Sequence, residues 1–213
     1  MSREITVVDY GSGNLFSVQR ALEHCGAPVR FAHDEAGIAS AGHLLLPGVG
    51  AFSEGMKGLA ERGLVAPIRR HAASGKPLLG ICLGMQMFAT LSHEFGEHPG
   101  LDLIPGTVDS IPRTDTDGIP HKIPHIGWAE LTPAAPDCWN GSVMAALEQG
   151  AYLYLVHSYK FTPEAPGDVL AQYEYGGHQI TAAVRRGNVT GFQFHPEKSA
   201  APGLSLLKRF IES

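Results

Sequence analysis

The sequence predicts an α/β protein with a mostly parallel central sheet, helices on both faces and added antiparallel strands in its second half. The first half alternates short apolar runs with helical patterns, which is typical of parallel strands joined by helices. The second half places strand patterns closer together, with hairpin-like turns such as Tyr175-Gly176-Gly177 between them. The 213 residues are 44% hydrophobic, enough for one core, so we expect a single domain over 1–213.

In the first half, four apolar runs are expected to form strands, because strands covered on both faces are continuously apolar. They are Ile5–Val8, Val29–Phe31, His43–Leu46 and Leu78–Ile81. The expected helices are Leu15–Cys25, ending at Gly26, Phe52–Ser74, interrupted near Gly63 and Pro67, and Met85–Leu91.

In the second half, the apolar patterns predict six strands and one terminal helix. The strands are Gly106–Ile111, Ile126–Leu131, Tyr152–Phe161, Val169–Tyr175, Ile180–Arg185 and Val189–Phe194, and the helix is Leu204–Ile211. Polar and proline-rich composition predicts exposed loops at Arg113–Pro120 and Pro133–Gly141.

Composition excludes several classes of function. The net charge of −5 argues against nucleic acid as a partner. The N-terminal MSREITVVDY does not have the pattern of a signal peptide, and no apolar run reaches the ~18 residues that span a bilayer. We therefore expect a cytoplasmic protein without a membrane partner. The three cysteines lack CxxC spacing, and Pro124 separates His121 from His125, so no metal site is expected.

The segment GICLGMQ, residues 80–86, is the first candidate for chemistry. Cys82 follows an apolar strand and precedes a helical pattern, with Gly80 and Gly84 two residues before and after it. This is the spacing of a nucleophile elbow, in which small neighbours let a strained turn pass close to other backbone. A helix N-terminus also favours the thiolate. The alternative is a buried cysteine in an ordinary turn.

The segment FHPE supplies a candidate base. His195 lies at the end of an expected strand, where the functional groups of open α/β sheets gather. Pro196 restricts its backbone, and Glu197 is placed to reach back and hold the imidazole. A histidine at a strand end can also be purely structural, but a cysteine elbow in the same chain favours a catalytic pair.

The turn Gly48-Val49-Gly50 ends another strand and is the candidate oxyanion site. Glycine-rich turns present backbone N–H groups to anions. Acyl transfer through Cys82 would develop a negative oxygen, which donors from this turn and the Leu83 N–H would hold, each worth roughly 3–4 kcal/mol. The alternative is a plain loop between strand and helix.

Together these segments resemble the class I (triad) glutamine amidotransferases over nearly the whole chain. More narrowly, the sequence is similar to the glutaminase subunits of imidazole glycerol phosphate synthases. The motifs are DYGSGNLFSV (9–18), LPGVGAF (46–52), GICLGMQ (80–86), IPHIGW (123–128), LVHSYKF (155–161) and FQFHPEKS (192–199).

The resemblance implies a flavodoxin-like sheet and glutamine hydrolysis by a Cys82, His195 and Glu197 triad, without metal or organic cofactor. It implies an oxyanion site at Val49, Gly50 and Leu83. It places the substrate against Gly48, Gln86, Glu94, His157, Ser158 and Tyr159. Ammonia would pass to a (β/α)8-barrel cyclase subunit, docked at Asn14, Trp128 and Lys198, to make imidazole glycerol phosphate in histidine biosynthesis.

Two features leave alternatives open. Ala129 follows Trp128 where that subfamily commonly has Asn, and the segment 109–124 is longer than in many relatives. The first alternative is a glutaminase subunit that serves another pathway, such as the amination of surface sugars. These two features leave the catalytic class intact. The alternatives to that class are a non-catalytic flavodoxin-like regulatory subunit and a cysteine peptidase or stress-type hydrolase on the same fold.

Overall fold

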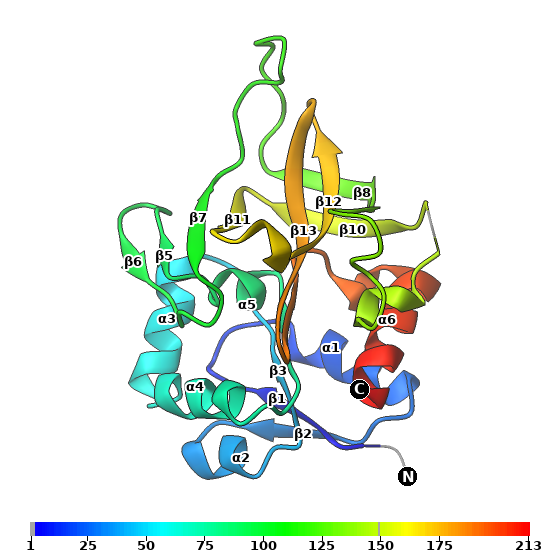
Figure 1. Ribbon diagram of the computed structural model, residues 1–213. Helices are drawn as coiled ribbons and strands as arrows, with labels where there is room; N and C mark the ends of the chain where they lie inside the picture. The colour runs from blue at the N-terminus through cyan, green and yellow to red at the C-terminus, as the bar shows by residue number, and fades with distance from the viewer. Residues whose placement is uncertain (1–2, 149) are drawn as a thin grey trace.

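The computed structural model describes residues 3–148 and 150–213, and an eight-stranded sheet forms its centre (Figure 1). The strand order is β2-β1-β3-β4-β14-β13-β12-β9, in which the first five strands are parallel and the last three are antiparallel to their neighbours. The parallel strands are β1 (Ile5–Val8), β2 (Val29–Ala32), β3 (His43–Leu46), β4 (Leu78–Ile81) and β14 (Val189–Phe192). The antiparallel strands are β9 (Thr132–Pro133), β12 (Val169–Tyr175) and β13 (His178–Arg186). The predicted fold class is confirmed.

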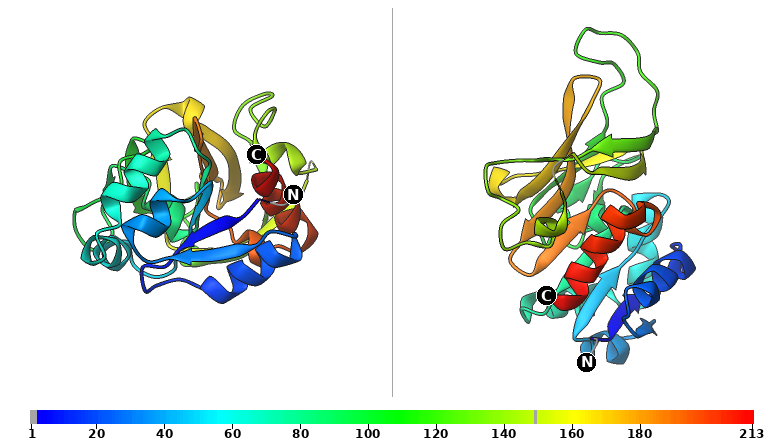
Figure 2. Two further views of the ribbon diagram at one scale, coloured as in Figure 1. Left: turned by 90° about the horizontal axis from the view of Figure 1, so that it is seen from below. Right: turned by 90° about the vertical axis from the view of Figure 1, so that its right-hand side faces the viewer.

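Helices cover both faces of the parallel strands (Figures 1 and 2). Helices α1 (Leu15–His24) and α6 (Ala200–Glu212) lie on one face, and α2 (Glu35–Ala39), α3 (Phe52–Glu61) and α4 (Val65–Ala73) on the other. Neighbouring strand residues alternate between the two resulting cores. For example, Leu45 packs in the core of α1 and α6, whereas Leu44 and Leu46 pack in the core of α3 and α4.

The predicted break in the second helical pattern lies at only one of its two expected positions. Gly63, with a φ of +68°, separates α3 from α4. Pro67 lies in the first turn of α4 and does not interrupt it. The first N–H groups of a helix have no partner within the helix, so proline is tolerated there.

The helix predicted at Met85–Leu91 is wrong. Helix α5 covers only Leu83–Gln86, and the chain then turns into β5 (Leu91–Ser92). The carbonyls that would continue the helix have other partners. Met87 O accepts from Leu101 N at 2.8 Å, and Phe88 O accepts from the N–H groups of residues 103 and 104 at 2.9 and 3.1 Å. Tertiary hydrogen bonds therefore end this helix early.

The single strand predicted at Tyr152–Phe161 is two strands in two sheets. Strand β10 (Tyr152–His157) pairs with β8 (His125–Glu130). After Ser158, β11 (Tyr159–Pro163) joins a four-stranded sheet, ordered β11-β7-β5-β6, with β7 (Gly106–Ser110) and β6 (His98–Pro99). The short elements α2, β5, β6 and β9 are not among the predicted ones, and β14 ends two residues before the predicted Val189–Phe194.

The predicted loop at Arg113–Pro120 projects from the body at the top of Figure 1. An isolated bridge between Thr114 and Pro120 closes it. The 3-10 turns η1 (Val143–Ala146), η2 (Pro166–Asp168) and η3 (Pro196–Lys198) complete the described structure. No helix in the described part of the chain is long and apolar enough to cross a membrane.

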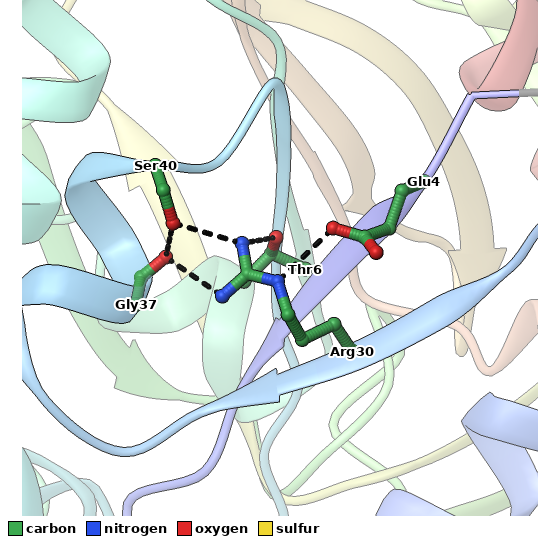
Figure 3. Close-up of polar contacts among 5 residues, drawn as sticks. All are labelled: Glu4, Thr6, Arg30, Gly37 and Ser40. Carbon is green, nitrogen blue, oxygen red and sulfur yellow. Dashed lines mark hydrogen bonds and ion pairs between the residues drawn. The ribbon is translucent and has the colours of Figure 1, made fainter.

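Arg30 links the outer parallel strand β2 to neighbouring elements through hydrogen bonds (Figure 3). Arg30 on β2 donates to Glu4 at 3.0 Å and to the buried hydroxyl of Thr6 on β1 at 2.9 Å. It also donates to the Gly37 carbonyl at 3.2 Å and to the Ser40 hydroxyl at 3.1 Å, at the end of α2. The guanidinium therefore joins β1, β2 and α2.

Candidate active site

Cys82 lies in a strained turn between β4 and α5. Its φ of 53° and ψ of −109° place it in a region that residues with a Cβ rarely adopt. Both flanking glycines are sterically required. A Cβ at Gly80 would lie 2.6 Å from the Phe88 ring, and one at Gly84 would collide with the Leu46 carbonyl oxygen. The elbow geometry predicted from the sequence is present.

His195 reaches Cys82 because β14 and β4 are adjacent parallel strands. Phe192 pairs with Ile81, so the residues that follow each strand emerge at the same edge of the sheet. His195 Nδ1 donates to Glu197 Oε1 at 2.9 Å, and only 3% and 1% of the two side chains is exposed. The other ring nitrogen, Nε2, is buried without a hydrogen-bond partner among the described residues. It is the nitrogen left to exchange a proton with Cys82.

The electrostatics of the site keep His195 protonated near neutral pH. Burial lowers the pKa of His195, but its interactions with Cys82 and Glu197 outweigh burial and raise the pKa to about 9. A protonated imidazole therefore lies at the same edge of the sheet as the Cys82 thiol.

A cavity of about 360 Å³ lies in front of these side chains. Most predicted site residues line it: Val49, Gly50, Cys82, Leu83, Gln86, Glu94, His157, Ser158, Tyr159 and His195. Phe95, Pro124 and Val156 also line it and were not predicted, although Pro124 belongs to the quoted IPHIGW motif. Within residues 3–148 and 150–213, no group of three or more His, Cys, Asp or Glu side chains is arranged to hold a metal ion.

Two polar side chains of the cavity are held by specific hydrogen bonds. Gln86 Nε2 donates to the Tyr159 carbonyl at 3.0 Å and to Gln193 Oε1 at 2.9 Å. Glu94 Oε2 accepts from the backbone N–H of Phe52 at 2.6 Å, at the start of α3. The cavity thus offers fixed hydrogen-bonding groups beside a nucleophile, as the binding of a small polar molecule requires.

The chain matches the family described as glutamine amidotransferase class-I over residues 6–213. It belongs to this family. It is 46% identical over 209 residues to "Imidazole glycerol phosphate synthase subunit HisH 1" of Legionella pneumophila strain Paris, which covers 98% of each chain. It is 44% identical over 210 residues to subunit HisH of Moorella thermoacetica, covering 99% of this chain and 95% of the relative.

Solved structures show the same fold at lower identity. One titled "Crystal structure of glutamine amidotransferase" is 19% identical, with a TM-score of 0.71, and covers 98% of this chain and 99% of that one. The structure of PurLQS from Thermotoga maritima also has a TM-score of 0.71 at 19% identity, covering 100% and 97%.

The predicted oxyanion residues Val49, Gly50 and Leu83 line the cavity. The Ser12 hydroxyl donates to the Val49 carbonyl at 3.2 Å, and because the two groups of a planar peptide point oppositely, the Gly50 N–H points away from Ser12. Gly50 has a φ of +98°, a conformation that favours glycine. Leu83 begins α5, so its N–H has no acceptor within the helix.

His157 is a neutral part of the cavity wall. Burial is the main cause that lowers its pKa to about 4. Its Nδ1 donates to the Tyr159 carbonyl at 2.7 Å, and its Nε2 accepts from the Tyr173 hydroxyl at 2.8 Å. Both ring nitrogens therefore bond to protein groups.

Five predicted residues lie outside the cavity lining: Glu197, Gly48, Asn14, Trp128 and Lys198. Gly48 packs against the elbow, where an added Cβ would lie 2.8 Å from the Leu83 Cβ. Asn14 caps α1 by accepting from Ser17 N at 3.3 Å, and α1 contacts the turn η3 that carries Lys198. Trp128 is 50% exposed.

Tyr154 joins two of these residues in one surface patch. The Trp128 ring meets the Tyr154 ring edge-on at 6.0 Å, and Lys198 Nζ lies 6.0 Å from the centre of the same ring. Exposed aromatic side chains such as Trp128 are enriched at protein interfaces.

The sequence reasoning missed Gln193, although it lies in the quoted FQFHPEKS motif. Its side chain is fully buried, and its Nε2 lies 3.7 Å from Cys82 Sγ. The available signal was a polar residue between Phe192 and Phe194, at a position where the apolar run predicts only core.

Proposed function

We propose that this chain is the glutaminase subunit of an imidazole glycerol phosphate synthase. It hydrolyses glutamine to glutamate and ammonia and passes the ammonia to a (β/α)8-barrel cyclase partner in histidine biosynthesis. The observation that carries the chemistry is the strained Cys82 elbow beside the buried His195–Glu197 pair, at a small cavity that Cys82 and His195 line. The names of relatives with 44–48% identity support the pathway.

Acylation begins with attack of the Cys82 thiolate on the side-chain amide carbon of glutamine. The carbonyl π electrons move to the oxygen, and the N–H groups of Gly50 and Leu83 stabilise this oxyanion. His195 Nε2 then gives its proton to the amide nitrogen. The C–N bond breaks, ammonia leaves, and a γ-glutamyl thioester remains on Cys82.

Deacylation uses the same groups in reverse. Water attacks the thioester carbon while neutral His195 takes its proton. The C–S bond breaks, glutamate leaves, and the thiolate and imidazolium are restored. Glu197 holds the ring, since its hydrogen bond to Nδ1 directs Nε2 toward the reacting atoms.

Glutamine is held in the cavity by Gln86, Glu94 and the segment His157–Tyr159. Glu94 is an acceptor-only carboxylate, which suits the α-ammonium group of an amino acid. Gly48 supports this wall by packing under Leu83. We further infer that the whole chain is one amidotransferase domain that acts in the cytoplasm; the family match over residues 6–213 supports the first statement.

The cyclase subunit docks on the surface formed by Asn14, Trp128 and Lys198. The exposed Trp128 supports this placement, because aromatic side chains are enriched at interfaces and half of this one is open to solvent. The turn η3 joins Lys198 directly to Glu197 and His195, so the docking surface lies beside the catalytic residues.

The test is to co-express the chain with the cyclase subunit of the same organism and measure glutamate release and imidazole glycerol phosphate formation. We expect Cys82→Ala to abolish both reactions from glutamine, while ammonium salts still support cyclisation in the complex. Cys138→Ala, at a free cysteine outside the cavity, is the matched control. Glutamate release from Cys82→Ala at the parent rate would disprove the nucleophile. Glutaminase activity without binding to the cyclase would assign the chain to another synthase.

A further inference from the structure

Gln193 connects the nucleophile to a second polar residue of the cavity. It follows β14 and precedes His195 by two residues, and its backbone N–H donates to the Ala182 carbonyl at 2.8 Å. Its side-chain amide contacts both of these residues. The Oε1 atom accepts from Gln86 Nε2 at 2.9 Å, and the Nε2 atom lies 3.7 Å from Cys82 Sγ. None of this side chain is exposed, so its polar groups depend on these partners.

The direction of these hydrogen bonds is fixed by one backbone carbonyl. The Tyr159 oxygen can only accept, and it receives both His157 Nδ1–H at 2.7 Å and Gln86 Nε2–H at 3.0 Å. Gln86 must therefore turn its NH2 group toward Tyr159. The second proton of that NH2 group requires an acceptor, which is Gln193 Oε1. Gln193 is left with its own NH2 group toward the sulfur.

We propose that Gln193 is a positioning residue that acts on both sides of the reaction. Its NH2 group donates to the Cys82 thiolate, which stabilises the charged sulfur and fixes its position at the strained elbow. Its carbonyl holds the amide of Gln86 in one orientation. This role rests on the proposed glutaminase function, although the effect on the sulfur is measurable in the chain without substrate.

The fixed orientation of Gln86 has a consequence for the ligand. Both protons of its NH2 group are used by protein acceptors, so its carbonyl oxygen is the group it can offer to the cavity. Glu94 also offers only acceptors. The structure assigns to this part of the cavity a ligand region rich in donors, such as the ammonium or the amide N–H groups of glutamine.

The first test measures the reactivity of Cys82 in the isolated chain. The rate of alkylation by iodoacetamide is followed at Cys82 by mass spectrometry from about pH 5 to 10, since the thiolate is the reacting form. Gln193→Met keeps the volume and removes the donor. We expect its rate profile to move to higher pH by about one unit, a change of ~1.4 kcal/mol. Thr190→Val, at a buried position on β14 outside the cavity, should leave the profile unchanged.

The second test separates the two roles with a double-mutant cycle in the complex with the cyclase. Gln193→Met and Gln86→Met should each raise KM for glutamine several-fold. In the Gln86→Met background, Gln193→Met should add little to KM but should still move the alkylation profile. If Gln193→Met does not fold, Gln86→Met tests the same chain of bonds, because the freed Gln193 amide should shift the profile in the same direction by a smaller amount.

The outcomes separate this inference from the proposed function. An unchanged alkylation profile and unchanged KM in folded Gln193→Met would overturn the inference and leave the glutaminase assignment intact. Additive effects of the two substitutions on KM would overturn the role through Gln86. A shifted profile in a chain that never releases glutamate would support the contact to Cys82 and refute the proposed function.

Discussion

Replacing Glu197 with glutamine removes one charge from the candidate triad and preserves its shape. The amide carbonyl introduced by Glu197→Gln can still accept from His195 Nδ1, so the ring keeps its orientation, but the imidazolium loses its buried counter-charge. The His195 and Glu197 side chains are almost completely buried, which makes solvent screening of this pair weak. We therefore expect Glu197→Gln to lower both the pKa of His195 and kcat.

The size of the effect follows from the pKa of His195. This pKa rises from 6.5 to about 9, a net stabilisation of the imidazolium of about 3 kcal/mol. Cys82 and Glu197 supply it together against the opposing effect of burial. If Glu197 supplies about half, its loss costs about 1–2 kcal/mol, and kcat should fall roughly 5- to 30-fold.

The same shift predicts a pH dependence of stability with a definite sign. Because the pKa of folded His195 lies above its unfolded value, its contribution is fully present below about pH 6.5 and is lost as the pH rises through about 9. The free energy of unfolding should therefore fall over this range in the parent protein. It should fall less in Glu197→Gln.

Two measurements check this prediction. NMR of the histidine Cε1–H groups follows the titration of His195, identified by the peak lost in His195→Gln, and steady-state glutamate release with the cyclase gives kcat. Glu23→Gln, on the exposed face of α1, is the matched control and should change neither. The reasoning is refuted if Glu197→Gln keeps both the parent titration midpoint and the parent kcat.

Three further substitutions, two of them with a control, test supports of the site and of the fold. Gly84→Ala places a Cβ against a backbone carbonyl of β3 and should cost more than about 3 kcal/mol of stability in urea unfolding, whereas Gly42→Ala, in open space, should cost less than about 1 kcal/mol. Arg30→Ala removes four hydrogen bonds between β1, β2 and α2 and should cost about 1–2 kcal/mol. Arg70→Ala, at a surface ion pair, should cost less than about 0.5 kcal/mol. The pKa of buried His157 is lowered to about 4. Stability should therefore fall as the pH drops from about 6.5 to about 4, and fall less in His157→Gln, in urea titrations at each pH.

The parallel half of the fold was predictable because its signals are local. Strands covered on both faces are continuously apolar, and Gly26 and Gly63 end the helices before them with positive φ. The elbow at Cys82 was predictable for a related reason. Gly80 lies against the Phe88 ring and Gly84 against the Leu46 carbonyl, and neither position has room for a larger side chain.

The failures have a common physical origin in long-range pairing. The run Met85–Leu91 has helical periodicity, but residues 101–104 take the carbonyls that a longer helix would need. The run Tyr152–Phe161 is uniformly strand-like, and its break at Ser158 depends on which strands are available on each side. In both runs the residues that determine the structure lie elsewhere in the chain, so the run's own sequence does not reveal them.

Gln193 shows why roles inside a site were harder to predict than the residues of the triad. Nucleophile, base and orienting acid are identified by residue type and by position at the ends of strands. A positioning amide has no such signature, because its role is defined by what lies at its two ends, and these partners come from α5 and from the elbow. Its sequence signal is only a polar residue in an apolar run.

The segment His157–Tyr159 links two of the sheets to the cavity. Its residues carry the chain from the β8–β10 sheet, which bears the exposed Trp128, into the β11–β7 sheet, and they line the cavity on the way. The carbonyl of Tyr159 fixes Gln86, and Gln86 in turn fixes Gln193 at the sulfur of Cys82. A partner bound at Trp128 would thus contact the β8–β10 sheet, from which the chain continues through Ser158 to the Tyr159 carbonyl that orients Gln86. A strand whose break at Ser158 has no signal in the sequence therefore lies between the proposed docking surface and Cys82.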